Sequence, residues 1–399
     1  MHIAFLLTQS LESPSGLGRY SPLAKELARL GHTIHIFALH PDFASLAQKN
    51  FEQDGVKIHY VAPMHVRKHG SLKSYYSTPQ LLSVASQATW QLCRAALATP
   101  AEIIHVFKPH PMNSLAGLAA RYLRGRRLFL DCDDYEAALG HFTSGWQRWG
   151  VALFEKTTPR YAHTVTTHTH FMKSKLLEWG VAEERIVYLP NGIDRQRFQP
   201  VDLERVATRR AQLGLENRPV AAYIGSLGLA SHAVDLLLEA FAQVHHTLPE
   251  SRLLMVGGGE DFEKLQTQGN ALGLGDAVLW VGRVPPNEVP MYYHLANVSV
   301  DPVRDDGAAR GRSPLKLFES WATGVPFVTA DVGERRRLLG SPPAGILAEP
   351  GNAAALATAI LQILGNTELA SSLSGLGALR LEGFTWDKLA LDLEKAYQR

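Results

Sequence analysis

The first half of the chain alternates short apolar segments with amphipathic ones. Segment 21–32 places Leu23, Leu27 and Leu30 on one helix face, and segment 114–125 also has helical spacing. The runs that predict buried strands are 2–8, 33–39, 56–62, 103–108, 126–134, 164–168 and 185–190. Strands that alternate with helices predict a parallel sheet covered on both faces.

A second series of the same kind begins near Arg218. Its helix is segment 233–248, and its strand-like runs are 219–226, 252–259, 277–282, 297–303, 326–330 and 345–350. We therefore predict an α/β fold of two doubly wound domains, residues 1–195 and 196–383, with stretch 191–202 as the hinge. The tail, about 384–399, predicts an amphipathic helix that could pack on either domain, with Trp386, Leu389, Leu393 and Tyr397 as its apolar positions.

Composition agrees with a two-domain globular protein. The 399 residues are 46% apolar and 20% charged, which supplies ample core material. The two cysteines, Cys93 and Cys132, lack metal-binding spacing and favour a reducing, cytoplasmic compartment. The first residues do not resemble a signal peptide, and no apolar run is long enough to predict a membrane span.

Charge is unevenly distributed between the two predicted domains. Residues 1–195 contain 21 Lys and Arg against 15 Asp and Glu, whereas the remainder contains 19 against 23. A basic first domain could contact an anionic membrane or acceptor, which would place the protein peripherally at the inner membrane face. An ordinary solvated surface is the alternative, and we expect no nucleic-acid partner.

The residues that directly follow predicted strands are the candidates for a binding site, because doubly wound sheets bind ligands beyond the carboxyl ends of their strands. Gly16 and Gly18 follow the first strand and would let the backbone approach a ligand ahead of a helix. The third glycine and the acidic residue of a dinucleotide fingerprint are missing. A purely structural turn is the alternative.

Two further strands of the first half end in charged side chains. Lys108 and His110 follow one strand, and His110 could serve as a base or bind an acceptor. The next strand ends in a cluster of four acids, Asp131, Asp133, Asp134 and Glu136. These carboxylates repel one another unless something offsets them. They could bind substrate hydroxyls, cap the next helix or hold a divalent ion.

The stretch 311–330 of the second half combines positive charge with a helix start. Ser313 and Pro314 lie where helix amides are unpaired, and Arg310, Arg312 and Lys316 add the charge that suits a diphosphate. Glu319 lies about a turn and a half further on, where a carboxylate could accept hydrogen bonds from ribose hydroxyls. An ordinary capped helix with an exposed glutamate is the alternative. Gly225 and Gly228, and Gly282 with Arg283, also follow strands.

The order and spacing of these segments resemble the retaining glycosyltransferases of family 4, which have the GT-B fold of two Rossmann-like domains facing a cleft. The similarity extends over nearly the whole chain and includes 188–198, 253–266, 281–303, 315–328 and 384–397. It implies a sugar nucleotide held by the second domain, an acceptor held by the first, and no metal or other cofactor.

The resemblance also implies roles for individual residues. Glu319 matches the glutamate that binds the donor ribose, and the backbone of Ser313, Pro314 and Leu315, with Lys316 and Arg312, would hold the diphosphate. Gly225 and Ser226 would lie near the same phosphates. Gly282, Arg283 and Val284 would border the base, and the loop of Gly16 and Gly18 would close on donor or acceptor.

Three departures from the family pattern stand out. Gly311 replaces the first glutamate of the motif, for which Asp305 or Asp306 could substitute. Ser226 and either Ser231 or His232 replace the usual arginine and lysine, so that Lys316 with Arg312 or Arg310 would supply the charge. Asp133 replaces the usual histidine.

The sequence thus predicts a metal-independent, retaining transfer of a sugar from a nucleoside diphosphate to a glycan, lipid or small-molecule hydroxyl. Asp133 or Asp134 would bind or orient sugar or acceptor hydroxyls. A sugar-nucleotide epimerase and a non-catalytic sugar-nucleotide-binding protein remain as alternatives, and a dinucleotide oxidoreductase is the weakest reading.

Overall fold

The computed structural model describes the chain except for residues 70–71, 140–141 and 143. The chain divides into two compact units. Unit 1 comprises 1–191, 311–313 and 386–399, and unit 2 comprises 192–310 and 314–385. The division after Asn191 falls inside the predicted hinge, and the C-terminal helix belongs to unit 1.

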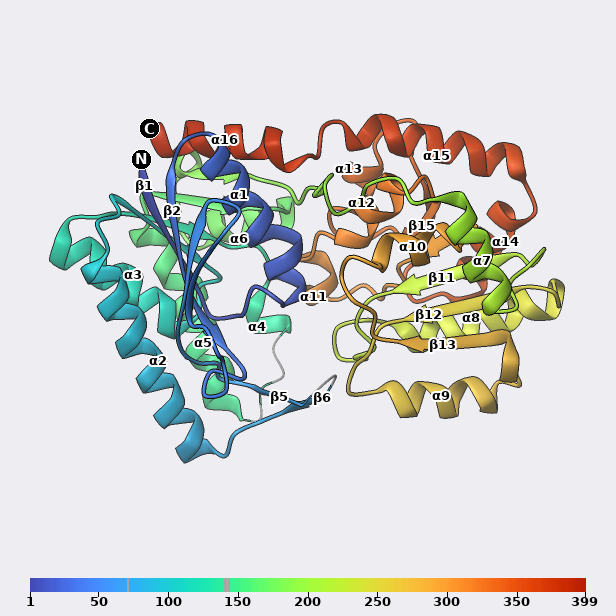
Figure 1. Ribbon diagram of the computed structural model, residues 1–399, viewed down its shortest axis with the longest axis horizontal. Helices are drawn as coiled ribbons and strands as arrows, with labels where there is room; N and C mark the ends of the chain where they lie inside the picture. Colours follow the sequence, from blue (N-terminus) through green and yellow to red (C-terminus); the bar gives the residue numbers. More distant parts are fainter. Residues whose placement is uncertain (70–71, 140–141, 143) are drawn as a thin grey trace. The chain divides into compact units, whose positions relative to one another are not determined.

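Unit 1 is built on an eight-stranded sheet in the order β10-β9-β8-β7-β1-β2-β4-β3. Figure 1 labels its strands β1 and β2. All neighbours are parallel except β3 and β4. The strands are β1 His2–Leu7, β2 Thr33–His40, β3 Asn50–Gln53, β4 Val56–Pro63, β7 Ile103–Phe107, β8 Arg127–Asp131, β9 Thr164–Thr167 and β10 Ile186–Tyr188. A separate hairpin pairs β5 Arg67–His69 with β6 Leu72–Ser74.

Helices cover both faces of the unit 1 sheet. The helices α1 Ser21–Arg29 and α16 Trp386–Gln398 pack on one face, and α2 Thr78–Ala98, α3 Pro111–Arg124 and α6 His170–Glu178 pack on the other. Two more helices, α4 Glu136–Leu139 and α5 Gly145–Thr157, follow β8. The four apolar residues predicted for the tail helix, Trp386, Leu389, Leu393 and Tyr397, are all buried in the core that α16 shares with α1.

Unit 2 contains a six-stranded parallel sheet in the order β13-β12-β11-β14-β15-β16. Its strands are β11 Val220–Ile224, β12 Arg252–Val256, β13 Val278–Gly282, β14 Val298–Val300, β15 Phe327–Ala330 and β16 Ile346–Ala348. Its helices are α7 Leu203–Gln212, α8 Val234–Thr247, α9 Phe262–Ala271, α10 Val289–His294, α11 Gly307–Arg310, α12 Leu315–Ala322, α13 Arg335–Leu339, α14 Ala353–Leu364 and α15 Thr367–Leu381. Two cores, one on each face, cover the sheet.

The segment predicted as a loop at Gly16 and Gly18 has a helical conformation. Both residues lie in a π-helical turn, Gly16–Tyr20, that continues into α1. The Gly16 N–H donates to Ser13 Oγ over 3.0 Å, and a β-carbon on Gly16 would lie 2.4 Å from the Leu11 carbonyl oxygen. Gly16 is therefore required by close backbone packing.

Within the described part of the chain, no single helix has the length and apolar composition of a membrane span. The helices α14 and α15 meet that test only as a pair, with a bend of 97° between them.

Candidate active site

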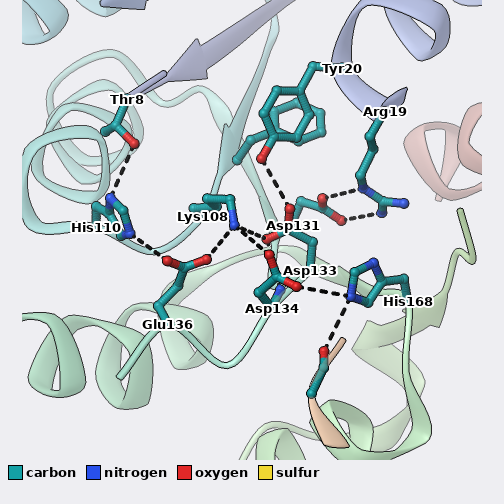
Figure 2. Close-up of polar contacts among 12 residues, drawn as sticks. Thr8, Arg19, Tyr20, Lys108, His110, Asp131, Asp133, Asp134, Glu136 and His168 are labelled. Atoms are coloured by element: carbon teal, nitrogen blue, oxygen red, sulfur yellow. Dashed lines mark hydrogen bonds and ion pairs between the residues drawn. The ribbon is translucent and has the colours of Figure 1, made fainter. Parts of the chain in front are cut away.

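The strand order of unit 1 fixes where a ligand can bind. The chain runs from β1 outward to β2 on one side and returns through β7 on the other side, so the topological switch point lies between β1 and β7. Ligands of doubly wound sheets bind at this point, beyond the carboxyl ends of the strands. Thr8 follows β1 and Lys108 follows β7, and both side chains lie at this edge, close to the acids that follow β8 (Figure 2).

The Lys108 ammonium supplies the positive charge that offsets the repulsion among the predicted cluster of acids. Its buried ammonium nitrogen lies 3.3 Å from Asp133, 2.8 Å from Asp134 and 2.5 Å from Glu136 (Figure 2). Lys108 adopts a left-handed backbone conformation, with φ of 64°, which is uncommon outside glycine. Its N–H donates to the Asp131 carbonyl over 3.0 Å, and its own carbonyl accepts from Asn113 Nδ2 over 2.9 Å. The surrounding hydrogen bonds thus hold a strained residue in place, as is frequent at functional sites.

The cluster divides into groups with opposite pKa shifts. Burial raises the pKa of Asp133 to about 7 despite the nearby Lys108, and the neighbouring acids add to this increase. Burial also acts on Glu136, but Lys108 and His110 outweigh it and lower the pKa of Glu136 well below its usual range. The three carboxylates, in turn, raise the pKa of Lys108 well above normal against the effect of burial. Lys108 and Glu136 are therefore an ion pair at neutral pH, while Asp133 is close to its titration midpoint.

His110 and Asp134 lie at the more accessible side of this cluster. His110 Nε2 lies 2.9 Å from Glu136, and its Nδ1 lies 3.2 Å from Thr8 Oγ1. Burial lowers the pKa of His168 to about 4, and this ring lies 3.7 Å from Asp134 and 3.3 Å from the Gly311 carbonyl. The Asp134 side chain is 18% exposed against 3% for Asp133, so Asp134 is the better placed of the two to meet a ligand.

The fourth acid, Asp131, has a separate partner. Arg19 donates to it through two nitrogens, over 2.8 and 2.7 Å, and the Thr166 hydroxyl also contacts it. Both members of the ion pair are buried. Arg19 also donates to Asn191 and to the carbonyls of residues 189 and 190. Asp131 is therefore a structural anchor that joins the start of α1 to the end of the unit 1 chain before the hinge.

Unit 2 has an equivalent arrangement at its own switch point, between β11 and β14. Lys316, on α12, reaches the ends of both strands. Its nitrogen lies 3.4 Å from Asp301, which follows β14, and 5.0 Å from the centre of the Tyr223 ring on β11. Gly225 leaves the space through which the lysine passes, since a β-carbon there would lie 2.7 Å from Lys316 Cε. Sequence reasoning found Lys316 and Gly225 but missed Asp301 and Tyr223.

Asp301 is a buried carboxylate held between two cations. Arg335 donates to the same side chain over 2.9 Å, and Lys316 approaches its other oxygen. Together these cations lower the pKa of Asp301 well below its usual range against the effect of burial. In the sequence, the only signal for Asp301 is that it follows the apolar run that forms β14.

Glu319 lies on α12, close to Lys316 in sequence. One of its oxygens accepts from Arg197 over 2.5 Å, and the other accepts from the Tyr293 hydroxyl over 3.0 Å. The alternative of an exposed glutamate is wrong, because only 15% of the Glu319 side chain is accessible. Arg197 and Tyr293 come from the hinge stretch and from α10, which explains why local sequence patterns did not reveal them.

The remaining predicted donor residues differ in their surroundings. Ser313 is buried, and among the described residues its hydroxyl has no hydrogen-bond partner. Its carbonyl accepts from Asn191 Nδ2 over 3.0 Å. Arg312 is half-buried. Burial acts to raise the pKa of Asp134, but Lys108 outweighs it and lowers this pKa, with a smaller contribution from Arg312. Ser226 and Arg283 are exposed, and Gly282 and Val284 are partly exposed. Pro314 is buried and is the N-cap residue of α12, which begins at Leu315.

Two suggested substitutes for the missing glutamate have other partners. Asp305 forms a two-fold ion pair with Arg310 over 2.6 and 2.9 Å, and both side chains are exposed. Asp306 caps α11 by accepting from the Ala309 N–H over 2.7 Å. Arg310 is therefore neutralised by its neighbour Asp305.

The acid cluster also has the spacing of a metal site. Ligand oxygens of Asp133, Asp134 and Glu136 lie within 4.8 Å of one another. However, the Lys108 ammonium contacts all three carboxylates and supplies the positive charge that an ion would provide. The donor set fits a divalent ion only if the lysine moves away.

Comparison with known proteins identifies the family. Residues 15–192 match the model described as glycosyl transferase 4-like domain, and residues 218–366 match that described as glycosyl transferases group 1. The two models together cover most of the chain. The chain belongs to the group 1 glycosyltransferases. Its fold is therefore GT-B, and its activity is that of a glycosyltransferase that uses a nucleotide sugar.

Curated relatives of this glycosyltransferase share about a quarter to a third of the aligned residues. A GDP-mannose-dependent alpha-(1-6)-phosphatidylinositol monomannoside mannosyltransferase of Mycolicibacterium smegmatis is 26% identical over 277 residues, which are 68% of this chain and 70% of the relative. A D-inositol 3-phosphate glycosyltransferase of Geodermatophilus obscurus is 31% identical over 55% of this chain and 48% of the relative.

A solved structure supports the fold over the full length. Sucrose-phosphate synthase from Thermosynechococcus elongatus superposes with a TM-score of 0.79 at 21% identity, and the match covers 100% of this chain and 98% of that structure. The predicted fold class and family are thus confirmed.

Proposed function

We propose that this glycosyltransferase moves a sugar, with retention of anomeric configuration and without a metal, from a nucleoside diphosphate to an acceptor hydroxyl. The observation that carries the proposal is the position of Lys316 and Glu319 on α12 at the switch point of unit 2. A helix start with a lysine suits a diphosphate, and a carboxylate nearby on the same helix suits the ribose.

The leaving group would be stabilised by residues at the start of α12. The first amides of a helix have no partner within it, and Lys316 adds positive charge at the same place. The buried Ser313 hydroxyl, which has no hydrogen-bond partner in the described part of the chain, would be satisfied by a phosphate oxygen. These donors would stabilise the charge that develops on the phosphate as the C1–O bond breaks.

Retention would follow from attack on the same face that the phosphate leaves. The acceptor oxygen forms the new bond to C1 while its proton passes to the departing phosphate oxygen. Asp134 and His110, the more accessible members of the unit 1 cluster, would bind or orient sugar or acceptor hydroxyls. Asp133 would act mainly by holding Lys108, because its carboxylate is almost fully buried.

The identity of donor and acceptor is a further part of the proposal. One relative is described as GDP-mannose-dependent and as acting on a phosphatidylinositol mannoside, and another as acting on an inositol phosphate. We propose a hexose donor, with GDP-mannose as the first candidate, and a polyol or glycolipid acceptor. Peripheral membrane contact is not needed for this chemistry and depends on a different part of unit 1.

The first experiment measures thermal unfolding with UDP-, GDP-, ADP-, CMP- and TDP-linked sugars, for wild type and Glu319→Ala. One nucleotide should raise the midpoint of the wild type and have much less effect on the variant. An equal rise in both proteins would place the donor elsewhere, and no rise with any nucleotide would contradict the proposed donor class.

Turnover then separates transfer from the alternatives. Transfer to an acceptor, with the anomer of the product assigned by NMR and the rate unchanged by EDTA, would support the proposed reaction. Conversion of the donor sugar without an acceptor would indicate an epimerase, and binding without any turnover would indicate a non-catalytic role.

A further inference from the structure

The outer surface of unit 1 is unusual in its distribution of carboxylates. No Asp or Glu occurs between Asp54 and Glu102, and none occurs between Glu102 and Asp131. The helices α2 and α3, which pack against each other, therefore contain no acidic residue. From 137 to 177 the single acid is Glu155, which is buried. The exposed charges in that stretch are thus all positive.

The helix α5 combines this positive charge with exposed aromatic residues. Trp146, Trp149 and Leu153 are 45%, 67% and 39% exposed. Their spacing of three, four and seven residues places them on one side of the helix. Lys156 lies on the same side by the same spacing and is exposed. This combination is typical of helices that lie in a membrane interface, where indole rings lie at the level of the headgroups and basic residues flank them.

The opposite side of α5 fixes its orientation. Glu155 is buried there and accepts from the backbone N–H groups of Glu136 and Ala137, over 2.6 and 3.1 Å. The helix α5 also packs against α4 and α3. Because these contacts hold the inner side, the tryptophan side faces outward in the folded unit. The described part of unit 1 does not cover this side of the helix.

We propose that α5 and the following turn, Thr158–Tyr161, form a docking surface for an anionic lipid bilayer. The surface is defined by Trp146, Trp149 and Leu153 as its apolar part and by Lys156 and Arg160 as its basic part, all of them exposed. Indole and leucine side chains enter the interface, and the lysine and the arginine attract the charged headgroups. Because α2 and α3 contain no acidic residue, they add no carboxylates that would repel anionic headgroups.

Charge complementarity selects the partner. A neutral bilayer would use only the three apolar side chains, which is too small an anchor for stable binding. An anionic leaflet adds an attraction of about fivefold in affinity for each basic residue close to it, and this attraction falls with ionic strength. Binding should therefore require both lipid charge and the tryptophans. The inference concerns membrane contact alone and does not rest on the proposed reaction.

The experiment is co-sedimentation with phosphatidylcholine vesicles, with and without phosphatidylglycerol, in the absence of any donor or acceptor. Wild type should bind the anionic vesicles at low ionic strength and be released by salt. Trp146→Ala/Trp149→Ala should lose about tenfold or more in partitioning, and Lys156→Glu should lose at least about fivefold. Matched controls in unit 2, Leu379→Ala and Lys264→Glu, change an exposed leucine and an exposed lysine and should bind as wild type does.

Unfolding midpoints and sugar-nucleotide binding of each variant show that the fold is intact. As a second measurement, lipids with brominated chains should quench wild-type tryptophan emission, and Trp146→Phe/Trp149→Phe should lose most of that quenching. No binding to anionic vesicles at low salt would overturn the proposal, and so would equal binding of the double tryptophan variant. A protein partner for α5 would then be the alternative.

Discussion

Lys316 passes Gly225 so closely that a β-carbon on the glycine would lie 2.7 Å from the lysine Cε. We expect Gly225→Ala to displace the lysine side chain, because its flexible end can move more easily than the backbone. The ammonium would then leave the switch point of unit 2. Affinity for the donor should fall by about tenfold, in the same direction as for Lys316→Met, since a charged hydrogen bond contributes ~1.5–3 kcal/mol. Calorimetric titration with the nucleoside diphosphate measures this loss.

Gly228→Ala is the matched control for this change. A β-carbon on Gly228 would come no closer than 3.7 Å to a neighbouring side chain, which is ordinary contact. This variant should bind the nucleotide as the wild type does. If Gly225→Ala kept full affinity while Lys316→Met lost it, the glycine would not control the lysine.

Lys108 is predicted to exclude metal from the acid cluster. Lys108→Gln leaves Asp133, Asp134 and Glu136 buried without a cation and should destabilise the protein by ~3–5 kcal/mol. Their oxygens already have the spacing of a metal site. Calcium should therefore raise the unfolding midpoint of the variant and leave that of the wild type unchanged.

Lys173→Gln serves as the reference for the calcium experiment, because it removes a partly exposed lysine of the same unit that pairs with a single exposed acid, Glu183. A variant Lys108→Gln that is as stable as wild type would contradict the ion-pair role. A destabilised variant without a calcium effect would show that the cluster protonates when the lysine is removed.

Glu155 predicts a pH dependence of stability. Burial, with the charge of Glu136, raises the pKa of this carboxyl from 4.5 to about 8. Between these values the folded state keeps a proton that the unfolded state has lost, so this group makes the free energy of unfolding fall as pH rises. In Glu155→Gln this contribution is absent, while the amide oxygen can still accept from the backbone.

The difference between wild type and Glu155→Gln isolates this effect, because all other titrating groups are common to both proteins. Relative to wild type, the free energy of unfolding of the variant should rise by up to about 1.4 kcal/mol per pH unit from pH 4.5 to 8. Above that range the difference between the two proteins should be constant. Denaturant unfolding at several pH values measures it. A constant difference across the whole range would mean that Glu155 titrates normally in the folded protein.

The sequence predicted the parallel strands of both sheets, because these runs are short, apolar and bounded by turns, but it missed the mostly polar strands β3, β5 and β6. The long helix α2 was not predicted, and the glycine turn before α1 was assigned to a loop instead of a helix. The helical turn was assigned to a loop because close backbone packing of Gly16 on Leu11 and a tight loop near a ligand both require glycine, so the sequence does not distinguish them.

The site was predicted only in part, for a reason that follows from topology. Lys108, Asp134 and Lys316 follow strands or begin a helix, so their position beyond strand ends could be inferred. Arg197 and Tyr293 reach Glu319 from segments far away in the sequence. Strand order and helix packing bring them together, and no local spacing encodes that. The same holds for Arg335 and Asp301.

The two donors to Glu319 lead to the last prediction. The buried Tyr293 hydroxyl and Arg197 each bind one carboxylate oxygen, and this arrangement fixes the direction in which the remaining lone pairs point. Tyr293→Phe should therefore raise the KM for the donor by about tenfold and leave kcat nearly unchanged, because the ribose lies away from the bond that breaks. Tyr292→Phe, which removes the adjacent buried hydroxyl that contacts Arg209, is the control.

A donor analogue that lacks the ribose hydroxyls distinguishes positioning from a purely structural role. With this analogue, wild type and Tyr293→Phe should have the same KM, since Glu319 has no hydroxyl left to bind. An equal loss with both donors would show that Tyr293 supports the fold of unit 2. A fall in kcat at constant KM would instead place the tyrosine and Glu319 close to the reacting bond, contrary to the ribose role proposed for α12.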